Sequence, residues 1–253
     1  MISHAVAGQP HPPRKILVID IGGTKLKVLA SGATEPRKAP SGKRMTPARM
    51  VEAVHALSVD WEYEAVSMGY PGLVGRSGPR SEPGNLGAGW VGFDFAAAFK
   101  MPVRVINDAS MQALGSYEGG RMLFLGLGTG LGSAFIADNV LVPLELGNIR
   151  YEKEKLGIVL GRASLRRLGK DVWRAAVADA ITFLSDAFVA DYVVVGGGNA
   201  KMMKELPSGA RRGHNLTAFR GGFRLWGLDN VPTFTADVTD PDPAKTPTEW
   251  RVI

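Results

Sequence analysis

Residues 15–30, KILVIDIGGTKLKVLA, carry the pattern that decides the fold. The apolar run at 16–19 has the length of a strand and ends at Asp20, and Gly22-Gly23 then permits a tight reversal. Apolar and polar residues alternate over 25–30, which predicts a second strand. Because a strand and not a helix follows the glycines, the segment is a β-hairpin and differs from a Walker-type nucleotide loop.

The turn of this hairpin could bind a phosphate group. Gly22 and Gly23 would leave backbone N–H groups free to meet phosphate oxygens, and the Thr24 hydroxyl could add to them. Asp20, at the end of the strand, could orient a water-shelled Mg²⁺ ion. An ordinary hairpin turn with a solvated aspartate would use the same residues.

The pattern of strand, glycine turn and strand occurs again after Gly119-Gly120. Strands are predicted over 122–126 and 131–137, and the turn between them contains Gly126-Leu127-Gly128-Thr129-Gly130. Residues 133–137 continue a strand, so this glycine spacing does not belong to a dinucleotide-binding loop, which opens a helix. We therefore expect two lobes that each begin with a hairpin.

This repetition predicts how the chain is divided. We expect a flexible N-terminus at 1–13, an N-terminal lobe at 14–118, a C-terminal lobe at 119–228 and a proline-rich tail at 229–253. The last helix of the C-terminal lobe could pack back on the N-terminal lobe.

Helices and further strands are indicated between the hairpins and after them. Thr46-Pro47 is typical of a helix start, with the threonine as N-cap and the proline in the first turn. Asn199, after the glycine turn Gly196-Gly197-Gly198, is expected to cap another helix. The other predicted elements are strands at 65–68, 103–106 and 191–195, and helices at 109–117 and 170–189.

Asn107-Asp108 is the candidate catalytic pair. It follows the strand at 103–106 and precedes a predicted helix, so the Asp108 side chain could project into a cleft. Phosphoryl transfer to an alcohol needs a group that aligns the hydroxyl and accepts its proton, and a carboxylate can do this. The same position also suits an ordinary helix N-cap, so Asp108 could be a cap instead of a base.

Further polar residues are candidates for binding sugar hydroxyls. Glu145 is a carboxylate between apolar neighbours in the second lobe, and Asn85 and Trp90 could supply an amide and an aromatic wall. Gly72, in the turn Gly69-Tyr70-Pro71-Gly72, would let a ligand approach the backbone. Each of these residues is also compatible with an exposed turn or a core position.

Composition limits the classes of function. The chain has 253 residues, a formal net charge of +6 and 45% hydrophobic residues, so it can bury a core and favours anionic partners. It has no cysteine, and its four histidines lack metal-binding spacing, so we expect no structural metal site. We expect a cytoplasmic protein with no membrane partner, since no apolar run could span a bilayer. Nucleic-acid binding would rest on net charge alone, and we expect none.

The five glycine-containing and acidic motifs occur in an order that resembles the ROK family of sugar kinases and repressors, in the actin and hexokinase-like superfamily, and above all its polyphosphate glucokinase branch. The resemblance runs from about residue 15 to residue 228. The motifs that carry it are Asp20-Ile21-Gly22-Gly23-Thr24-Lys25, Gly69-Tyr70-Pro71-Gly72, Asn107-Asp108-Ala109, Gly128-Thr129-Gly130-Leu131-Gly132 and Gly196-Gly197-Gly198. Glu145-Leu146-Gly147 and residues 218–226 add to the likeness with the polyphosphate branch.

The resemblance implies a two-lobed, ribonuclease H-like (actin and hexokinase-like) α/β fold with mixed sheets and an interlobe cleft. It implies that Asp108 is the base on the sugar 6-hydroxyl. It also implies a homodimer and a donor that is ATP or inorganic polyphosphate with Mg²⁺. The positions that match the sugar site are Gly72, Asn85, Asn107, Asp108, Glu145 and Asn148. The positions that match the phosphate site are Asp20, Gly22, Gly23, Thr24, Lys25, Gly128, Thr129, Gly130, Gly196, Gly197 and Gly198.

The chain departs from the family pattern at two places. Many members carry a cysteine-rich zinc motif after the glutamate, and this chain has no cysteine, so structural zinc is not expected. Asn148 stands where the family's sugar kinases usually have a histidine that contacts the sugar. The leading hypothesis is a hexokinase or glucokinase type of phosphotransferase, and the alternative is a sugar or nucleotide sensor of the same fold that has lost turnover.

Overall fold

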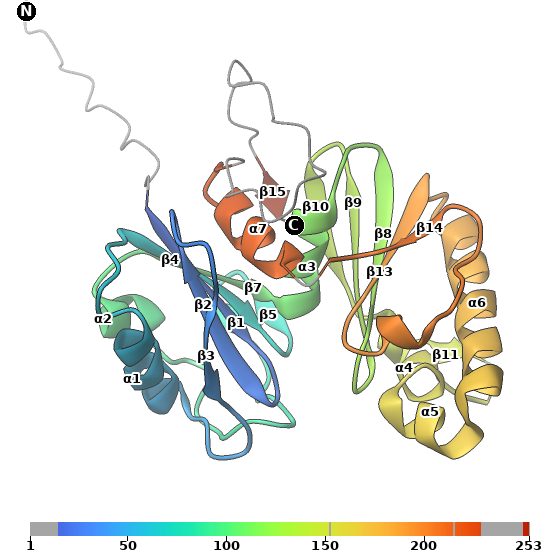
Figure 1. Ribbon diagram of the computed structural model, residues 1–253, viewed down its shortest axis with the longest axis horizontal. Helices are drawn as coiled ribbons and strands as arrows, with labels where there is room; N and C mark the ends of the chain where they lie inside the picture. The colour runs from blue at the N-terminus through green and yellow to red at the C-terminus, as the bar shows by residue number, and fades with distance from the viewer. Residues whose placement is uncertain (1–14, 152, 215, 229–249, 253) are drawn as a thin grey trace, which may run out of the picture.

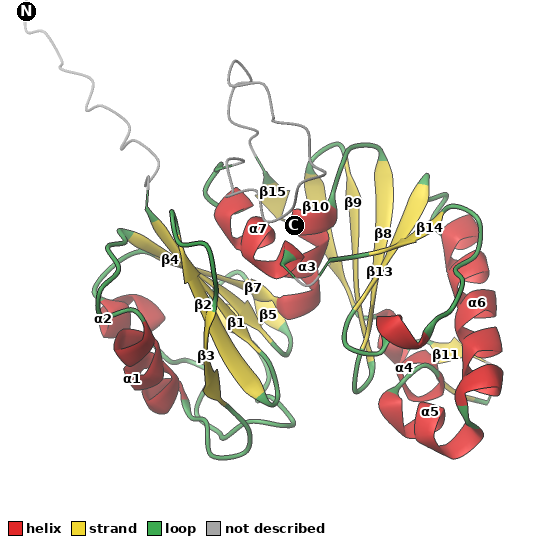
Figure 2. Ribbon diagram, viewed as in Figure 1, coloured by secondary structure: helices red, strands yellow, loops and turns green. Residues whose placement is uncertain are grey.

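The computed structural model describes residues 15–151, 153–214, 216–228 and 250–252 (Figure 1). Two β-sheets stand apart with helices α3 (Asp108–Ser116) and α7 (Thr217–Arg224) between them, as Figure 2 shows by secondary structure. The first sheet has the strand order β3-β2-β1-β4-β7, and the second has the order β14-β13-β8-β9-β10-β15. Both sheets mix parallel and antiparallel pairs, so the predicted two-lobed α/β fold with mixed sheets is confirmed.

The first sheet is built around a central strand that is buried on both faces. Strand β1 (Ile16–Ile21) pairs with β2 antiparallel and with β4 parallel, and its six residues are all buried. Residues 17, 19 and 21 face the core under α1 and α2, whereas residues 16 and 18 face α3 and α7. The other elements of this lobe are β2 (Lys25–Ala30), β3 (Arg37–Pro40), α1 (Pro47–Leu57), β4 (Ala65–Tyr70), β5 (Val74–Gly75), β6 (Gly78–Pro79), α2 (Phe95–Phe99) and β7 (Val103–Asn107).

The second sheet repeats this arrangement. In β8 (Arg121–Leu127), residues 123, 125 and 127 face α6 (Lys170–Ala187), and residues 122 and 124 face α3 and α7. The remaining described elements are β9 (Leu131–Ala137), β10 (Val140–Leu144), η1 (Leu146–Asn148), β11 (Arg150–Tyr151), β12 (Glu154–Lys155), α4 (Leu156–Val159), α5 (Arg162–Leu168), β13 (Tyr192–Gly196), η2 (Ala200–Met202), β14 (Ala210–Arg212) and β15 (Arg251–Val252).

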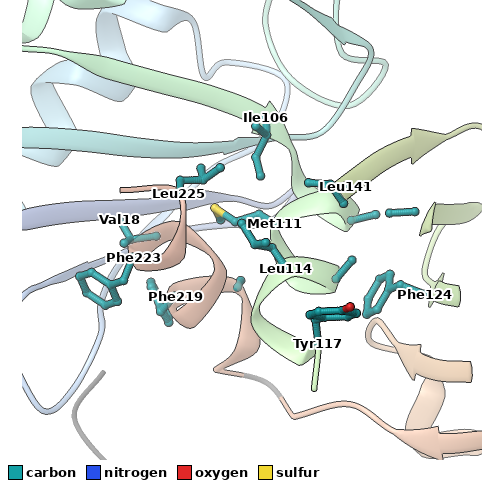
Figure 3. Close-up of a cluster of buried hydrophobic side chains, with 14 of the residues drawn as sticks. Val18, Ile106, Met111, Leu114, Tyr117, Phe124, Leu141, Phe219, Phe223 and Leu225 are labelled. Atoms are coloured by element: carbon teal, nitrogen blue, oxygen red, sulfur yellow. The ribbon is translucent and has the colours of Figure 1, made fainter. Parts of the chain in front are cut away.

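Helices α3 and α7 join the two lobes through one hydrophobic cluster. Figure 3 shows Val18 of β1, Met111 and Leu114 of α3, and Phe219 and Phe223 of α7 gathered in it. The helices approach closely because both contact points are glycines. A Cβ atom at Gly115 would lie 1.8 Å from the Thr217 carbonyl oxygen, and one at Gly221 would lie 1.8 Å from the Met111 carbonyl oxygen.

The last helix of the second lobe, α7, packs on the first sheet. The Ser67 hydroxyl of β4 donates to the Gly222 carbonyl oxygen at 2.5 Å, and a Cβ atom at Gly222 would lie 2.3 Å from Val18 Cγ1. The indole N–H of Trp226, just after the helix, donates to the same Ser67 hydroxyl at 2.9 Å. Helix α7 and the residues after it therefore lie against the first sheet.

Two details near the C-terminal end differ from the sequence-based expectation. The segment after Gly198 forms only a 3₁₀ turn at Ala200–Met202, and the Asn199 side chain makes no cap bond to it. Residues 251–252 form β15 beside β10, whereas a loosely packed tail was expected there. Trp250 packs edge-on against Tyr117, with ring centroids 5.5 Å apart, which ties this end of the chain to α3. The expected flexible N-terminus and the rest of the expected tail, residues 229–249, lie outside the described residues.

Candidate active site

The carboxyl ends of three parallel strands bring the motifs of the first lobe together. Strand β4 lies between β1 and β7, and the register pairs Asp20 with Gly69 and Tyr70 with Asn107. Asp20, the turn after β4 and the Asn107-Asp108 pair therefore lie at one edge of the sheet. Ligands of open α/β sheets bind at this edge.

The glycine turns of the second lobe meet in the same way. Strands β8 and β13 are parallel and pair Gly126 with Gly196, so the turn at 128–130 lies beside the turn at 196–198. The Asn199 amide Nδ2 donates to the Gly128 carbonyl oxygen at 2.8 Å, which joins the two turns. In Figure 1 the turns of both hairpins lie at the lower ends of their sheets, on the same side of the molecule.

Helix α3 begins at the junction of the two lobes. The Asn107 side chain is its N-cap: Oδ1 accepts from the Ala109 N–H at 2.9 Å and from the Ser110 N–H at 3.2 Å. Asn107 Nδ2 donates to the Gly72 carbonyl oxygen at 3.1 Å, which fixes the turn after β4. The alternative that Asp108 is the cap is therefore wrong, because Asp108 is the first helical residue and its neighbour has the capping role.

Two glycines that the sequence analysis placed in the family motifs, Gly69 and Gly132, let α3 start this close to both sheets, a role that the motifs did not indicate. A Cβ atom at Gly132 of β9 would lie 2.7 Å from Ala109 Cβ. A Cβ atom at Gly69 of β4 would lie 2.4 Å from Met111 Cε and 3.6 Å from Asp108 Cα. A glycine within a strand, as both are in the structure, often marks a close approach of another backbone, and this was the available signal.

Two other carboxylates, Asp20 and Glu145, act electrostatically on Asp108 at this junction. Burial raises the pKa of Asp108 to about 7, and the charges of Asp20 and Glu145 raise it further against the opposing effect of the Ala109 N–H. Burial also raises the pKa of Glu145. A carboxyl group with a pKa near neutrality is suited to exchange a proton at physiological pH, so Asp108 has the electrostatic setting of a general base.

Asp20 has a partner that the sequence reasoning missed. Lys27 lies directly across the hairpin from it, and its Nζ atom is 2.7 Å from Asp20 Oδ2. The Asp20 side chain is only 12% exposed, so this pair partly neutralises a carboxylate that burial would otherwise disfavour. The register of the hairpin was the signal, because residues on paired strands face one another.

The first glycine turn offers less free backbone than the sequence indicated. The Gly22 N–H donates to the Lys25 carbonyl oxygen at 3.0 Å within the turn, and the Gly22 carbonyl accepts from the Ser41 hydroxyl at 2.5 Å. Thr24 and Lys25 are exposed at the tip. The Asn85 amide lies against Gly23, since a Cβ atom there would be 2.1 Å from Asn85 Nδ2. Asn85 is thus beside the turn, while the Gly22 N–H is not free.

The turns at 128–130 and 196–198 of the second lobe depend on glycines for their conformation and for the open space beside them. A Cβ atom at Gly128 would meet no atom within 4 Å, so this position faces open space, whereas the Gly128 N–H is used by the Gly130 carbonyl at 3.1 Å. Gly197 has φ +81° and a Cβ atom there would lie 2.4 Å from the Leu127 carbonyl oxygen, so only glycine fits. Thr129 is exposed between them.

An open cavity of about 1250 Å³ adjoins the start of α3. It is lined from the first lobe by the β5–β6 hairpin and by strand β7 with Asn107, and from the second lobe by the end of β10 with Glu145. Asn148 is not part of this lining, and its Oδ1 atom accepts from Lys155 Nζ at 3.3 Å. Trp90 is fully buried in the core of the first lobe against Tyr70 and Phe95, so its expected role as a pocket wall is wrong.

The donor set at the junction fits Mg²⁺ better than zinc. Mg²⁺ prefers oxygen ligands and is usually held by one or two carboxylates together with substrate phosphates and water. Asp20, at the edge beside the first glycine turn, is a carboxylate of this kind. Within the described ranges, no group of three or more His, Cys, Asp or Glu side chains is placed to hold a metal ion. Within those ranges, too, no helix is both long and apolar enough to cross a bilayer.

Comparisons with known proteins agree with this geometry. The family model described as "ROK family" matches residues 16–146. The inorganic polyphosphate/ATP-glucomannokinase of Arthrobacter sp. strain KM is 25% identical, with a TM-score of 0.73 over 85% of this chain and 99% of that one. The ROK hexokinase of Thermus thermophilus is 19% identical, with a TM-score of 0.63 over 82% of this chain and 96% of that one.

A regulator has the same fold. A ROK family transcriptional regulator, a homologue of the E. coli MLC protein, is 16% identical, with a TM-score of 0.64 over 84% of this chain and 77% of its own. None of the curated proteins matches this chain. The likeness in fold therefore spans both enzymes and regulators.

Proposed function

The chain belongs to the ROK family, and on that premise we propose that it is a sugar kinase that transfers a phosphoryl group to the 6-hydroxyl of glucose or a similar hexose. ATP or inorganic polyphosphate is the donor. The name of the Arthrobacter enzyme, an inorganic polyphosphate/ATP-glucomannokinase, includes both donors and supports this choice.

One observation carries the proposal. Asp108 begins the helix that lies between the carboxyl edges of the two sheets, close enough to Asp20 on one side and Glu145 on the other for both charges to raise its pKa. A lone cap or a buried structural carboxylate would not need two further carboxylates beside it. Perturbed acids of this kind cluster at functional sites.

In the proposed reaction Asp108 accepts the proton of the sugar hydroxyl. The hydroxyl oxygen attacks the terminal phosphorus of the donor, the bond from that phosphorus to the bridging oxygen breaks, and the proton passes to an Asp108 carboxylate oxygen. Asn107 positions the base, because its side chain fixes the first turn of α3. The helix N-terminus helps keep Asp108 ionised before the transfer.

The hexose is assigned to the side of the junction that faces Glu145. Gly72, Asn85, Asn107, Glu145 and Asn148 are the residues proposed to bind its hydroxyl groups. Asn107 and Glu145 line the same cavity, which supports their pairing around one ligand.

The donor is assigned to the glycine turns. Backbone and side-chain groups of Gly23, Thr24, Lys25, Thr129, Gly130, Gly196, Gly197 and Gly198 would hold its phosphates. Gly22 and Gly128, whose N–H groups are bonded within their turns, would shape the two turns and let the phosphates approach. Asp20 would hold Mg²⁺, which supplies shielding of the phosphate charge when it is bound. Closure of the lobes around the donor would exclude water and so limit hydrolysis.

A donor-by-sugar matrix tests this function. Hexose 6-phosphate formation is measured with ATP or polyphosphate as donor and with glucose, mannose and N-acetylmannosamine as acceptors. The proposal expects product with at least one pair and dependence on Mg²⁺. If the sugars raise the melting temperature but no pair gives product, the protein is a sensor of this fold and the kinase proposal is wrong.

A further inference from the structure

The cavity beside the proposed hexose site is larger than a single hexose needs. Its volume is about 1250 Å³, whereas pockets for drug-sized ligands span roughly 300–1,000 Å³. Besides Asn107 and Glu145, its lining includes the rest of β7, the β5–β6 hairpin and Trp250. A ligand bound at Asn107 and Glu145 therefore has room for a further group at the far end.

Three arginines line this extension. Arg76 is at the turn of the β5–β6 hairpin, Arg80 follows the hairpin, and Arg104 is on β7. Within the part of the chain that the structure describes, none of the three is paired with a carboxylate. Unpaired guanidinium groups that share one cavity create a positive field, and they bind phosphate or carboxylate groups through paired hydrogen bonds.

The acidic residues of the cavity, Asp94 and Glu145, offset this charge only in part, because two carboxylates face three arginines. Asp94 accepts from the Ala97 N–H at 2.9 Å as the N-cap of α2. Glu145 lies at the other end, near the proposed hexose position. Arg104 is held in place by its stacking over the Trp226 ring, 4.0 Å from the centroid, and by a hydrogen bond to the Leu225 carbonyl. The guanidinium is thus ordered before a ligand arrives, which lowers the entropic cost of binding.

The donor does not account for these arginines. No residue of the glycine turns at 22–25, 128–130 or 196–198 lines the cavity. Asn107 and Glu145, which are proposed to bind the hexose, do line it. The anion that the arginines would bind therefore belongs on the acceptor side.

We propose that the acceptor is an anionic saccharide, which carries a phosphate or carboxylate group in addition to the hydroxyl that is phosphorylated, and that Arg76, Arg80 and Arg104 bind this group. The inference rests on the proposed kinase function, and it narrows the class of acceptor. The transfer itself is unchanged: the new phosphorus–oxygen bond forms at the free hydroxyl, the proton passes to Asp108, and the group held by the arginines keeps its bonds.

Binding is measured first, because it does not depend on turnover. Glucose 1-phosphate and methyl α-glucopyranoside carry an anionic and a neutral group at the same position, and calorimetry compares their affinities. We expect glucose 1-phosphate to bind about tenfold tighter or more, as charge-assisted hydrogen bonds to guanidinium groups imply. The Arg76→Gln/Arg80→Gln variant should lose this advantage. Arg166→Gln, on α5 outside the cavity, should keep it.

Binding measurements with added inorganic phosphate show whether the arginines bind an anionic group of the acceptor or a separate, free anion. The proposal expects inorganic phosphate to compete with glucose 1-phosphate and not to tighten the binding of glucose. If inorganic phosphate and glucose together bind as tightly as glucose 1-phosphate, the anion is a separate ligand and the proposal is wrong. Equal affinity of the two glucosides in the wild-type protein would also overturn it.

Measurements of turnover then distinguish the proposed kinase function from the proposal that the acceptor is anionic. If both neutral and anionic acceptors are phosphorylated, the ratio of their kcat/KM values should favour the anionic one and fall about tenfold or more in the Arg76→Gln/Arg80→Gln variant. An unchanged ratio would refute the anionic acceptor and leave the kinase function intact. If no acceptor is phosphorylated although glucose 1-phosphate binds through the arginines, the kinase function fails and the anion site stands.

Discussion

The carboxyl edges of the two sheets contribute to the candidate site by different chemistry. The first lobe brings charged side chains, with Asp20 paired to Lys27 and Asp108 at the start of α3. The second lobe brings the glycine turns at 128–130 and 196–198, which are tied to each other through Asn199. Glu145 is the carboxylate of that lobe that approaches Asp108.

The contrast between charged side chains at the first edge and glycine turns at the second suits phosphoryl transfer. A base must carry charge, so it belongs on an element whose position is fixed by caps and close packing, as α3 is. A phosphate chain is itself anionic, so it is best held by backbone N–H groups that add no negative charge. We therefore propose that proton transfer belongs to the first edge, and that the second edge, together with the turn at 22–25, binds the donor.

The largest expected effect comes from the first edge. Asp108→Asn should lower kcat roughly 10²- to 10⁴-fold, because the amide keeps the shape of the side chain but cannot accept the proton. The dissociation constant for the sugar should change little. Steady-state kinetics and calorimetry measure the two quantities, and Asp179→Asn on the exposed face of α6 is the matched control.

The stability of the same variant is an independent check. In the wild type the pKa of Asp108 rises from 3.8 to about 7 on folding, so the folded state loses stability as pH rises through this window. Asp108→Asn removes the loss and should raise the free energy of unfolding at pH 8 by up to about 4 kcal/mol, with little change at pH 4. A variant with full turnover, or one that is less stable at pH 8, would contradict the assignment.

The next effect comes from the second edge. Gly128→Val adds a side chain where a Cβ atom meets nothing within 4 Å, so the protein should fold with an unchanged melting temperature. The new side chain would occupy the path proposed for the donor, and we expect the KM for the donor to rise about tenfold or more. The KM for the sugar should stay the same. If the sugar KM rises instead, the donor has been placed at the wrong edge.

Much of the fold was predictable because its patterns are local. Both hairpins, the helix after Thr46 and the strand that leads to Asn107 follow from strand-length apolar runs, glycine turns and one N-cap. The return of the chain end was not predictable in this way. Strand β15 has two residues, and its pairing with β10 depends on a tertiary contact that no local pattern encodes.

For the candidate site, the sequence indicated residues that the structure places near one another, but not their detailed contacts. The sequence indicated Asp20, Asp108 and Glu145, and the structure brings these three carboxylates together. It did not indicate Lys27 as the partner of Asp20 or the contact of Gly132 with α3, because these depend on which atoms face each other across strands and lobes. Trp90 was misjudged because an aromatic residue after glycines suits a pocket wall and a core equally well.

A smaller effect tests how the two edges are held together. Gly132→Ala would place its Cβ atom 2.7 Å from Ala109 Cβ, and neither partner is flexible, so α3 must shift. We expect a loss of about 1–3 kcal/mol in stability and a several-fold loss in kcat. Gly69→Ala is the matched variant, because its Cβ atom meets mainly the end of the Met111 side chain. Chemical denaturation and kinetics should give a larger effect for Gly132→Ala, and the reverse order would mean that α3 is positioned mainly by the first sheet.

The smallest expected effect is on the pH dependence of catalysis. It compares how strongly Asp20 of the first lobe and Glu145 of the second lobe influence the pKa of Asp108. Since Asp108 must be ionised to act as a base and its pKa is about 7, kcat/KM for the sugar should be half of its plateau value near pH 7 and fall further in acid. Asp20 contributes more than Glu145 to raising this pKa, so Asp20→Asn should move the midpoint to lower pH by more than Glu145→Gln does. The midpoint is compared in each variant at saturating donor, whatever its plateau rate. A wild-type midpoint near pH 4 would exclude Asp108 as the base, and a larger shift in Glu145→Gln would mean that the second lobe has the greater influence on the base.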